Sequence, residues 1–190
     1  MRDRTHTAPK LGSGVVLVFP ALLISACGAN LPGSATGSSD GAFGQVTGYH
    51  AANFFLPQGY SVAALDGGRF RVTATASSET PLSRIEKIAM ARAAEFGAEQ
   101  GKKFFQATPA VHSVKCGKRQ QTVNGQRVAA RPTHYAIAAI EVIYTDQVAD
   151  AALKPTKDTA EALKAEIQSE VVSAEAQTQA ATDVSAKCGR

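Results

Sequence analysis

Residues 69–101 read RFRVTATASSETPLSRIEKIAMARAAEFGAEQG, and the spacing of their apolar residues changes part-way along. Over residues 69–76, apolar side chains alternate with polar ones, which is typical of a strand with one buried face. From Leu82 onward they recur at three- and four-residue spacing, which predicts a helix that ends before Gly101. A strand followed directly by such a helix indicates that the helix packs on one face of a sheet.

Two further strands are expected downstream. Residues 104–114 read as an extended segment, interrupted by Pro109 because proline cannot donate to a sheet ladder. Residues 133–145 are apolar at nearly every position, which predicts a strand covered on both faces for much of its length. The pair Asn124-Gly125 is a tight-turn signal that would join these two strands as a hairpin. We therefore predict an α+β domain over residues 49–146, a small β-α-β-β sheet with one packed helix.

The segments next to this domain core have their own patterns. Within residues 49–65, aromatic residues such as Phe54 and Phe55 predict a short strand or a loop that closes the core. Residues 147–190 are rich in Ala, Glu, Gln and Lys, and they predict a helical C-terminal tail divided at Pro155. One narrow face of the tail carries Ala160, Leu163, Ile167, Val171 and Ala174. This face either packs against the domain or supports weak self-association as a coiled coil.

The first residues of the chain have the order of an exported precursor. Basic residues at positions 2, 4 and 10 precede an apolar run over residues 11–26. That run is long enough for the core of a signal peptide but short for a permanent membrane span, and Pro20 interrupts it. We therefore interpret residues 1–26 as a removable signal peptide.

The residues around Cys27 indicate a lipid anchor on the cleaved protein. The sequence Ile24-Ser25-Ala26-Cys27 resembles a bacterial lipobox. The resemblance implies that Cys27 is joined to diacylglycerol, becomes the new N-terminus and is acylated again, so that the protein is anchored to a membrane. It also implies outer-membrane sorting towards the periplasm, because Gly28 rather than aspartate comes after the cysteine. Residues 27–48, rich in Gly, Ser, Ala and Thr, are then a lipidated flexible tether.

Short segments of the core carry a second resemblance. They are Gly59-Tyr60, Arg69-Phe70-Arg71-Val72, Arg84-Ile85-Glu86, Arg92-Ala93-Ala94-Glu95 and Gly101 with Phe104-Phe105. These segments resemble a family of proteobacterial envelope lipoproteins of unknown function, which implies a small lipid-anchored domain and no catalytic residue. Independently of that resemblance, the small alanines allow close helix packing, and Arg92 can pair with Glu95 one turn along or present a recognition surface.

Charge limits the class of partner. The formal net charge of +4 falls to +2 when Arg2, Asp3, Arg4 and Lys10 are removed with the signal peptide, so strong attraction to nucleic acid is not implied. A local basic cluster contains Lys115, Lys118, Arg119, Arg127 and Arg131, with no acidic residue between them. The cluster is either a solvated hairpin tip or a site for an anionic envelope partner, such as lipid phosphates or an acidic protein patch. Nucleic acid is not expected, because the cluster lacks interleaved aromatic residues.

The cysteines allow a covalent link between distant parts of the chain. With Cys27 lipidated, Cys116 and Cys188 remain as a pair in an oxidising compartment. They can form an intramolecular disulfide that ties the tail to the domain, stay free, or bridge two molecules.

Metal binding depends on the hairpin register. His112, Cys116 and His134 carry the imidazole and thiolate groups that bind zinc or copper. In a simple hairpin around Asn124-Gly125, Cys116 opposes Thr133 and His112 opposes Ile137, so His134 points to the other face of the sheet. We therefore predict no metal site and no cofactor.

The sequence gives little support for a catalytic role. The histidines do not stand in a recognisable nucleophile motif. The carboxylates that could act as acid and base fit a solvated helix face better; they are Glu79, Glu86, Glu95 and Glu99. We expect a non-catalytic binding or scaffolding module on the envelope. A secreted hydrolase, or a metal-binding protein using His112 and Cys116, is the alternative.

Overall fold

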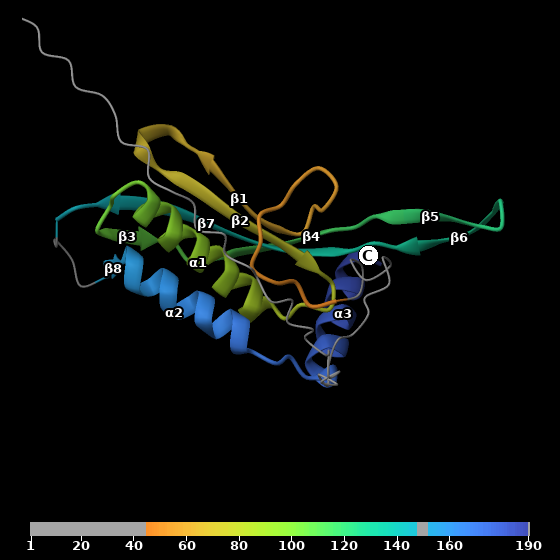
Figure 1. The fold of residues 1–190 in the computed structure, drawn as a ribbon. Helices are drawn as coiled ribbons and strands as arrows, with labels where there is room; N and C mark the ends of the chain where they lie inside the picture. The colour runs from red at the N-terminus through yellow and green to blue at the C-terminus, as the bar shows by residue number, and fades with distance from the viewer. Residues whose placement is uncertain (1–44, 148–151, 190) are drawn as a thin grey trace, which may run out of the picture. The chain divides into compact units, whose positions relative to one another are not determined.

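The structure, a computed structural model, describes residues 45–147 and 152–189 (Figure 1). The predicted signal peptide (1–26), the lipidation site Cys27 and most of the predicted tether lie outside the described residues. Within the described ranges, no helix combines the length and the apolar character needed to cross a bilayer.

The domain has an α+β fold, as predicted, built on a six-stranded antiparallel sheet with three helices. Its strands are β1 (Gly59–Ala64), β2 (Phe70–Ser77), β3 (Phe104–Ala107), β4 (Val111–Lys115), β7 (Tyr135–Thr145) and β8 (Lys154–Pro155). The strand order is β1-β2-β7-β3-β8, and β4 pairs with β7 beyond the end of β3. Two more strands, β5 (Lys118–Val123) and β6 (Gln126–Pro132), form a separate two-stranded sheet.

Strand β7 is the centre of the sheet. Strands β2 and β3 each run antiparallel to β7 on opposite sides of it, so they are parallel to one another. The break between β3 and β4 falls around Pro109, as predicted, and the Thr108 amide there donates to the Glu141 carbonyl at 2.9 Å. The bulge between these strands keeps both on the same edge of β7.

The helices are α1 (Leu82–Glu99), α2 (Thr156–Ser169) and α3 (Ala174–Cys188). Helix α1 packs against β2 and β7, α2 packs against α1, and α3 contacts β4 (Figure 1). Gly101 follows α1 with a positive φ of 71°, which confirms the predicted left-handed end of that helix.

The core lies between α1 and the sheet. Alternate residues of β2 and β7 are buried, and they meet a helix face of isoleucine and alanine. The buried residues on this interface include Val72, Ala74, Ala76, Ile85, Ile88, Ala89, Ala93, Ala138, Ile140 and Val142. Gly97 marks the closest approach, since a Cβ there would lie 2.5 Å from the Tyr144 ring. The small residues allow the helix to lie close to the sheet.

The prediction that the 133–145 strand is covered on both faces was wrong. In β7, Ala136, Ala138, Ile140 and Val142 are buried, but the residues between them are not. Ile143, on the other face, is 52% exposed. The apolar run therefore belongs to a strand with one fully buried face. The other face also carries apolar side chains but is not fully buried.

Residues 45–65 correct the predicted boundary of the tether. Thr47 is buried, and its amide donates to Thr80 Oγ1 at 2.9 Å while its hydroxyl accepts from the Ser77 amide at 3.0 Å. The folded domain thus begins by residue 45 rather than at 49. The predicted strand in 49–65 is β1, but Phe54 and Phe55 are almost fully exposed and do not close the core.

Beyond Pro155 the predicted tail contains two helices, α2 and α3, rather than the single longer helix expected there. Ala160 and Ile167 of α2 are buried in the domain core, so most of the face suggested for self-association is already occupied. Val171 lies in the break between α2 and α3 and is 93% exposed. The tail is therefore an integral part of the domain.

Candidate functional site

The basic hairpin, defined as β5, β6 and their turn (118–132), is the first candidate. Asn124 and Gly125 have φ values of 52° and 78°, which is the backbone of a type I′ turn and confirms the predicted hairpin. The hairpin pairs with no other strand of the described chain, and it extends away from the helices in Figure 1. An isolated two-stranded sheet is only marginally stable in water, so this hairpin needs stabilising contacts at its base.

Exposed cations lie on and beside this hairpin. Lys115, Lys118 and Arg127 are exposed and form no ion pair within the described residues. The backbones of Arg119 and Arg131 pair with one another, while their side chains lie outside the described part of the chain. Four of the five residues in the predicted basic cluster therefore belong to the hairpin backbone, and Lys115 lies beside it at the end of β4.

The hairpin register differs from the predicted one. Near the turn, Val123 pairs with Gln126 as expected. A bulge between Arg119 and Gln121 then shifts the pairing by one residue, so that Arg119 opposes Arg131 rather than Ala130. The shifted register continues into β4 and β7, where His112 opposes Ala138 instead of Ile137.

This shift reverses the predicted placement of His134. In the shifted register His134, rather than Thr133, comes opposite Cys116. The Gly117 amide donates to His134 Nδ1 at 3.4 Å, and the Thr133 amide donates to the Gly117 carbonyl at 2.9 Å. Because side chains alternate along a strand, a single bulge moved His134 to the face that the sequence had excluded.

The Cys–His cluster consists of Cys116, His134 and Cys188. Cys116 and Cys188 form the disulfide that the sequence had left open, with Cα atoms 5.6 Å apart and a sequence separation of 72. A ring nitrogen of His134 joins the two sulfur atoms in a group of metal-ligand atoms that all lie within 4.8 Å of one another. The disulfide fixes the end of α3 to the base of the basic hairpin.

His112 belongs to a different contact. Its Nε2 atom lies 2.7 Å from Glu86 Oε1 on α1. The cluster of potential metal ligands found in the described residues contains His134 and not His112. The structure therefore does not group His112 with Cys116, and the metal-binding alternative that used these two residues stays a prediction.

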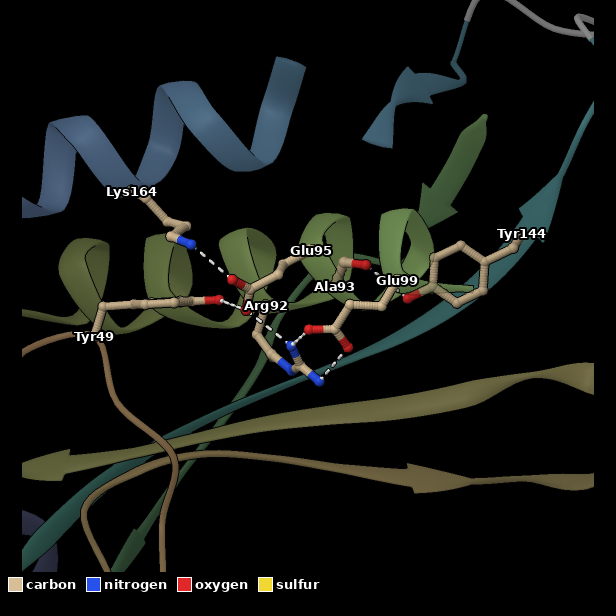
Figure 2. A network of polar contacts seen from close by, with 7 residues as sticks. All are labelled: Tyr49, Arg92, Ala93, Glu95, Glu99, Tyr144 and Lys164. Atoms are coloured by element: carbon tan, nitrogen blue, oxygen red, sulfur yellow. Dashed lines mark hydrogen bonds and ion pairs between the residues drawn. The ribbon is translucent and has the colours of Figure 1, made fainter. Parts of the chain in front are cut away.

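A second polar cluster, the Glu95 network, joins α1 to α2 and to the N-terminal segment (Figure 2). Glu95 accepts hydrogen bonds from Lys164 Nζ at 2.6 Å, from the Tyr49 hydroxyl at 2.6 Å and from Arg92 Nη1 at 2.8 Å. Arg92 also donates to both carboxylate oxygens of Glu99, at 2.7 and 2.9 Å. The predicted Arg92–Glu95 pair is therefore present.

Burial and hydrogen bonding set the pKa values of this network. Burial alone would raise the pKa of the Glu95 carboxyl, but the hydrogen bonds from Lys164, Tyr49 and Arg92 outweigh it and lower the pKa to about 2. The pKa of Tyr49 is raised by burial and by its bond to Glu95. Burial also raises the pKa of Tyr144 to about 12, and its hydroxyl donates to the Ala93 carbonyl at 2.7 Å.

The Glu95 network is a structural contact between elements. The guanidinium of Arg92 lies over the rings of Tyr60 and Phe96, 5.2 and 5.5 Å from their centroids. Each of these cations and carboxylates therefore forms an ion pair or hydrogen bond with a neighbouring side chain. This arrangement fits a structural role in joining elements better than a substrate-binding site. The prediction that Glu95 lies on a solvated helix face was wrong. Tyr49 and Lys164, which are distant from Glu95 in sequence, cover its carboxylate.

A mainly apolar cavity of about 280 Å³ lies beside the Cys–His cluster. It is bounded by α3, β4 and the start of α1, through residues such as Leu82, Val114 and Val184. Asp183 and Lys187 are its ionisable lining residues.

Comparison with known proteins gives no relative. The chain matches no protein-family model, no curated protein and no solved structure. The resemblance to envelope lipoproteins and the lipobox therefore stay predictions from the sequence.

Proposed function

We propose that this protein is a non-catalytic envelope lipoprotein, held on the outer membrane facing the periplasm by acylated Cys27. In this role the basic hairpin binds anionic lipid headgroups. The observation that carries the proposal is a hairpin with exposed Lys118 and Arg127 that contains no acidic residue and pairs with no other strand of the described chain.

The base of the hairpin supports a binding role. The Cys116–Cys188 disulfide and the Gly117–Thr133 hydrogen bond hold the base, while Lys118 begins β5 at the base and Arg127 lies in β6 close to the turn. A hairpin held in this way presents its charges in a fixed order and loses little conformational freedom on binding. This favours a docking role over a solvated turn.

The lipid surface is favoured among anionic partners by the tether. A Gly/Ser-type coil of about 20 residues has a reach of roughly 25 Å, so an acylated Cys27 would keep the hairpin near a bilayer. Each Lys or Arg near an anionic surface contributes about 1 kcal/mol. Several such residues on one hairpin give a useful interaction once the anchor supplies a high local concentration.

Hydrogen exchange on vesicles tests the hairpin. The mature lipidated protein is reconstituted into vesicles containing phosphatidylglycerol and into vesicles of phosphatidylcholine alone, and amide exchange is followed by mass spectrometry. We expect slower exchange over residues 118–132 on the anionic vesicles, with the protection lost at high salt. Equal exchange on both vesicle types would contradict lipid binding.

A matched pair of variants separates the effect of charge on the hairpin from the effect of the protein's net charge. The double change Lys118→Glu and Arg119→Glu should abolish the protection on anionic vesicles. The control Lys154→Glu and Lys157→Glu makes the same change in net charge at exposed positions of β8 and α2, and it should leave the protection intact. Equal losses in the two variants would indicate overall charge rather than the hairpin.

Intact mass spectrometry tests the anchor separately. Protein purified from membranes should begin at residue 27 and carry acyl chains, whereas a Cys27→Ser version should remain unprocessed. An unacylated or uncleaved chain would overturn the anchoring part of the proposal.

A further inference from the structure

The Cys–His cluster places three soft or borderline metal ligands at one point. Cys116 lies just beyond the end of β4, His134 just before the start of β7, and Cys188 in the last turn of α3. Their ligand atoms lie within 4.8 Å of one another. Three separate segments thus bring their ligand atoms together in a small volume.

The ligand set fits zinc better than hard cations. Zinc binds thiolate sulfur at about 2.3 Å and imidazole nitrogen at about 2.0–2.1 Å, with tetrahedral geometry. Two thiolates and one imidazole leave a fourth position for water, a combination that also occurs in zinc enzymes. Magnesium and calcium prefer oxygen ligands, which this cluster does not offer.

The disulfide excludes metal binding while it is present. A sulfur atom in a disulfide carries no thiolate charge, so neither Cys116 nor Cys188 can act as a strong ligand in the oxidised form. We propose that, when this disulfide is reduced, Cys116, Cys188 and His134 bind one zinc ion. The protein then has two alternative links between α3 and the hairpin base, one covalent and one through the metal.

The chemistry of the exchange balances with a dithiol as the reductant. The dithiol gives two electrons and two protons to the Cys116–Cys188 bond, which breaks into two thiols, and the dithiol itself becomes a disulfide. Zinc then displaces one proton from each thiol as it binds the two thiolates. His134 contributes a lone pair and loses no proton, because it ligates as neutral imidazole.

Contacts other than the disulfide keep the ligands close after reduction. Val184, one turn before Cys188, is 5% exposed and packs in the domain core. Ser173 caps the first turn of α3 by accepting a hydrogen bond from the Ala176 amide at 3.2 Å. The backbone pairing across Gly117 and Thr133 holds Cys116 and His134 opposite one another.

Zinc titration in competition with a chromophoric chelator tests the site. The full chain is used untagged with Cys27→Ser, so that its thiols are those of Cys116 and Cys188, and a thiol-free phosphine serves as the reductant. We expect one zinc per reduced chain and none per oxidised chain. Cobalt in place of zinc should give the thiolate-to-metal absorption of a tetrahedral site. Reduced protein that binds no zinc, or oxidised protein that binds it equally, overturns the proposal.

Two histidine variants identify the third ligand. His134→Ala leaves the disulfide intact, and it should weaken zinc binding by the reduced chain at least as much as the roughly 10–100-fold that loss of a ligand's supporting hydrogen bond costs. His112→Ala is the matched control and should bind as tightly as the unsubstituted chain. Unchanged affinity in His134→Ala, or an equal loss in His112→Ala, overturns the assignment. Circular dichroism follows folding, and a reduced chain that unfolds and does not recover with zinc also counts against it.

Discussion

The α1–sheet core and the α3–hairpin end of the domain are held by different means. In the core, many apolar side chains such as Ile85, Ile88 and Val142 are buried between helix and sheet. In α3, one residue, Val184, is buried, and a disulfide joins the helix to the hairpin base. Apolar burial keeps its strength whatever the redox conditions, whereas a disulfide can be broken chemically. The two ends should therefore respond differently to reduction.

Breaking the disulfide should cause the largest loss in the free energy of unfolding. For two cysteines 72 residues apart, the chain-entropy estimate is a loss of about 4 kcal/mol in the free energy of unfolding, reduced by any strain in the bond. Urea unfolding with and without a reductant, in the presence of a chelator, measures it. Hydrogen exchange in α3 should accelerate more than exchange in α1.

The double variant Cys116→Ser and Cys188→Ser is the control for this prediction. It should match the reduced protein and show no further response to reductant. If reduction leaves the urea midpoint unchanged, the packing of α3 holds this end without the covalent bond, and the contrast with the core fails.

Truncating one core side chain should cause the next largest loss of stability. Ile85→Ala is expected to lower the free energy of unfolding by about 2–5 kcal/mol, because Ile85 is fully buried between α1 and the sheet. Ile143→Ala makes the same chemical change on the open face of β7 and should alter stability by about 0.5 kcal/mol at most. Urea unfolding of both variants gives the comparison. Equal losses would mean that the open face is covered in solution.

The core was predictable because its pattern is local. The alternation in 69–76 and the three- and four-residue spacing after Leu82 are each fixed by the geometry of one element, and both elements were found. The open face of β7 was not predictable, because apolar residues on both faces look the same in sequence whether or not a second layer is present. The tail was expected to divide at Pro155, but the break between α2 and α3 was missed, since residues 170–173 carry no strong breaker.

The candidate sites depended on contacts that sequence spacing does not contain. The position of His134 was decided by one bulge between Arg119 and Gln121, which no turn residue indicates. The partners of Glu95 come from residues 46 and 69 positions away. The Asn124-Gly125 turn and the clustering of basic residues were visible in advance, because both belong to a single hairpin.

Adding a methyl group at the closest helix–sheet approach should have a smaller effect than removing core atoms. A Cβ at position 97 would lie 2.5 Å from the Tyr144 ring and 2.8 Å from Thr156 Cγ2, so neighbouring atoms must move. Gly97→Ala should cost about 1–3 kcal/mol. Gly48→Ala is the control, because a Cβ there meets no atom within 4 Å. Thermal unfolding of both variants checks this, and a stable Gly97→Ala would show that α1 can shift on the sheet.

The smallest effect concerns pH and the Glu95 network. The Glu95 pKa of about 2 in the folded protein lies below the ordinary glutamate value of 4.5, so its contribution is present above pH 4.5 and is lost as pH falls towards 2. With its side chain 22% exposed, solvent screening reduces this contribution to about 1–2 kcal/mol.

The variant Glu95→Gln isolates this contribution. It should be less stable than the unsubstituted protein at pH 7, and the difference should shrink towards pH 2. Glu161→Gln, at an exposed position of α2, removes the same charge without touching the network and should show no such trend. Urea unfolding of the three proteins across this pH range makes the measurement. A difference that does not depend on pH would mean that the network stabilises the protein through packing and the tyrosine hydrogen bond. The contact between α1 and α2 would then belong, like the core, to the part of the molecule held by burial.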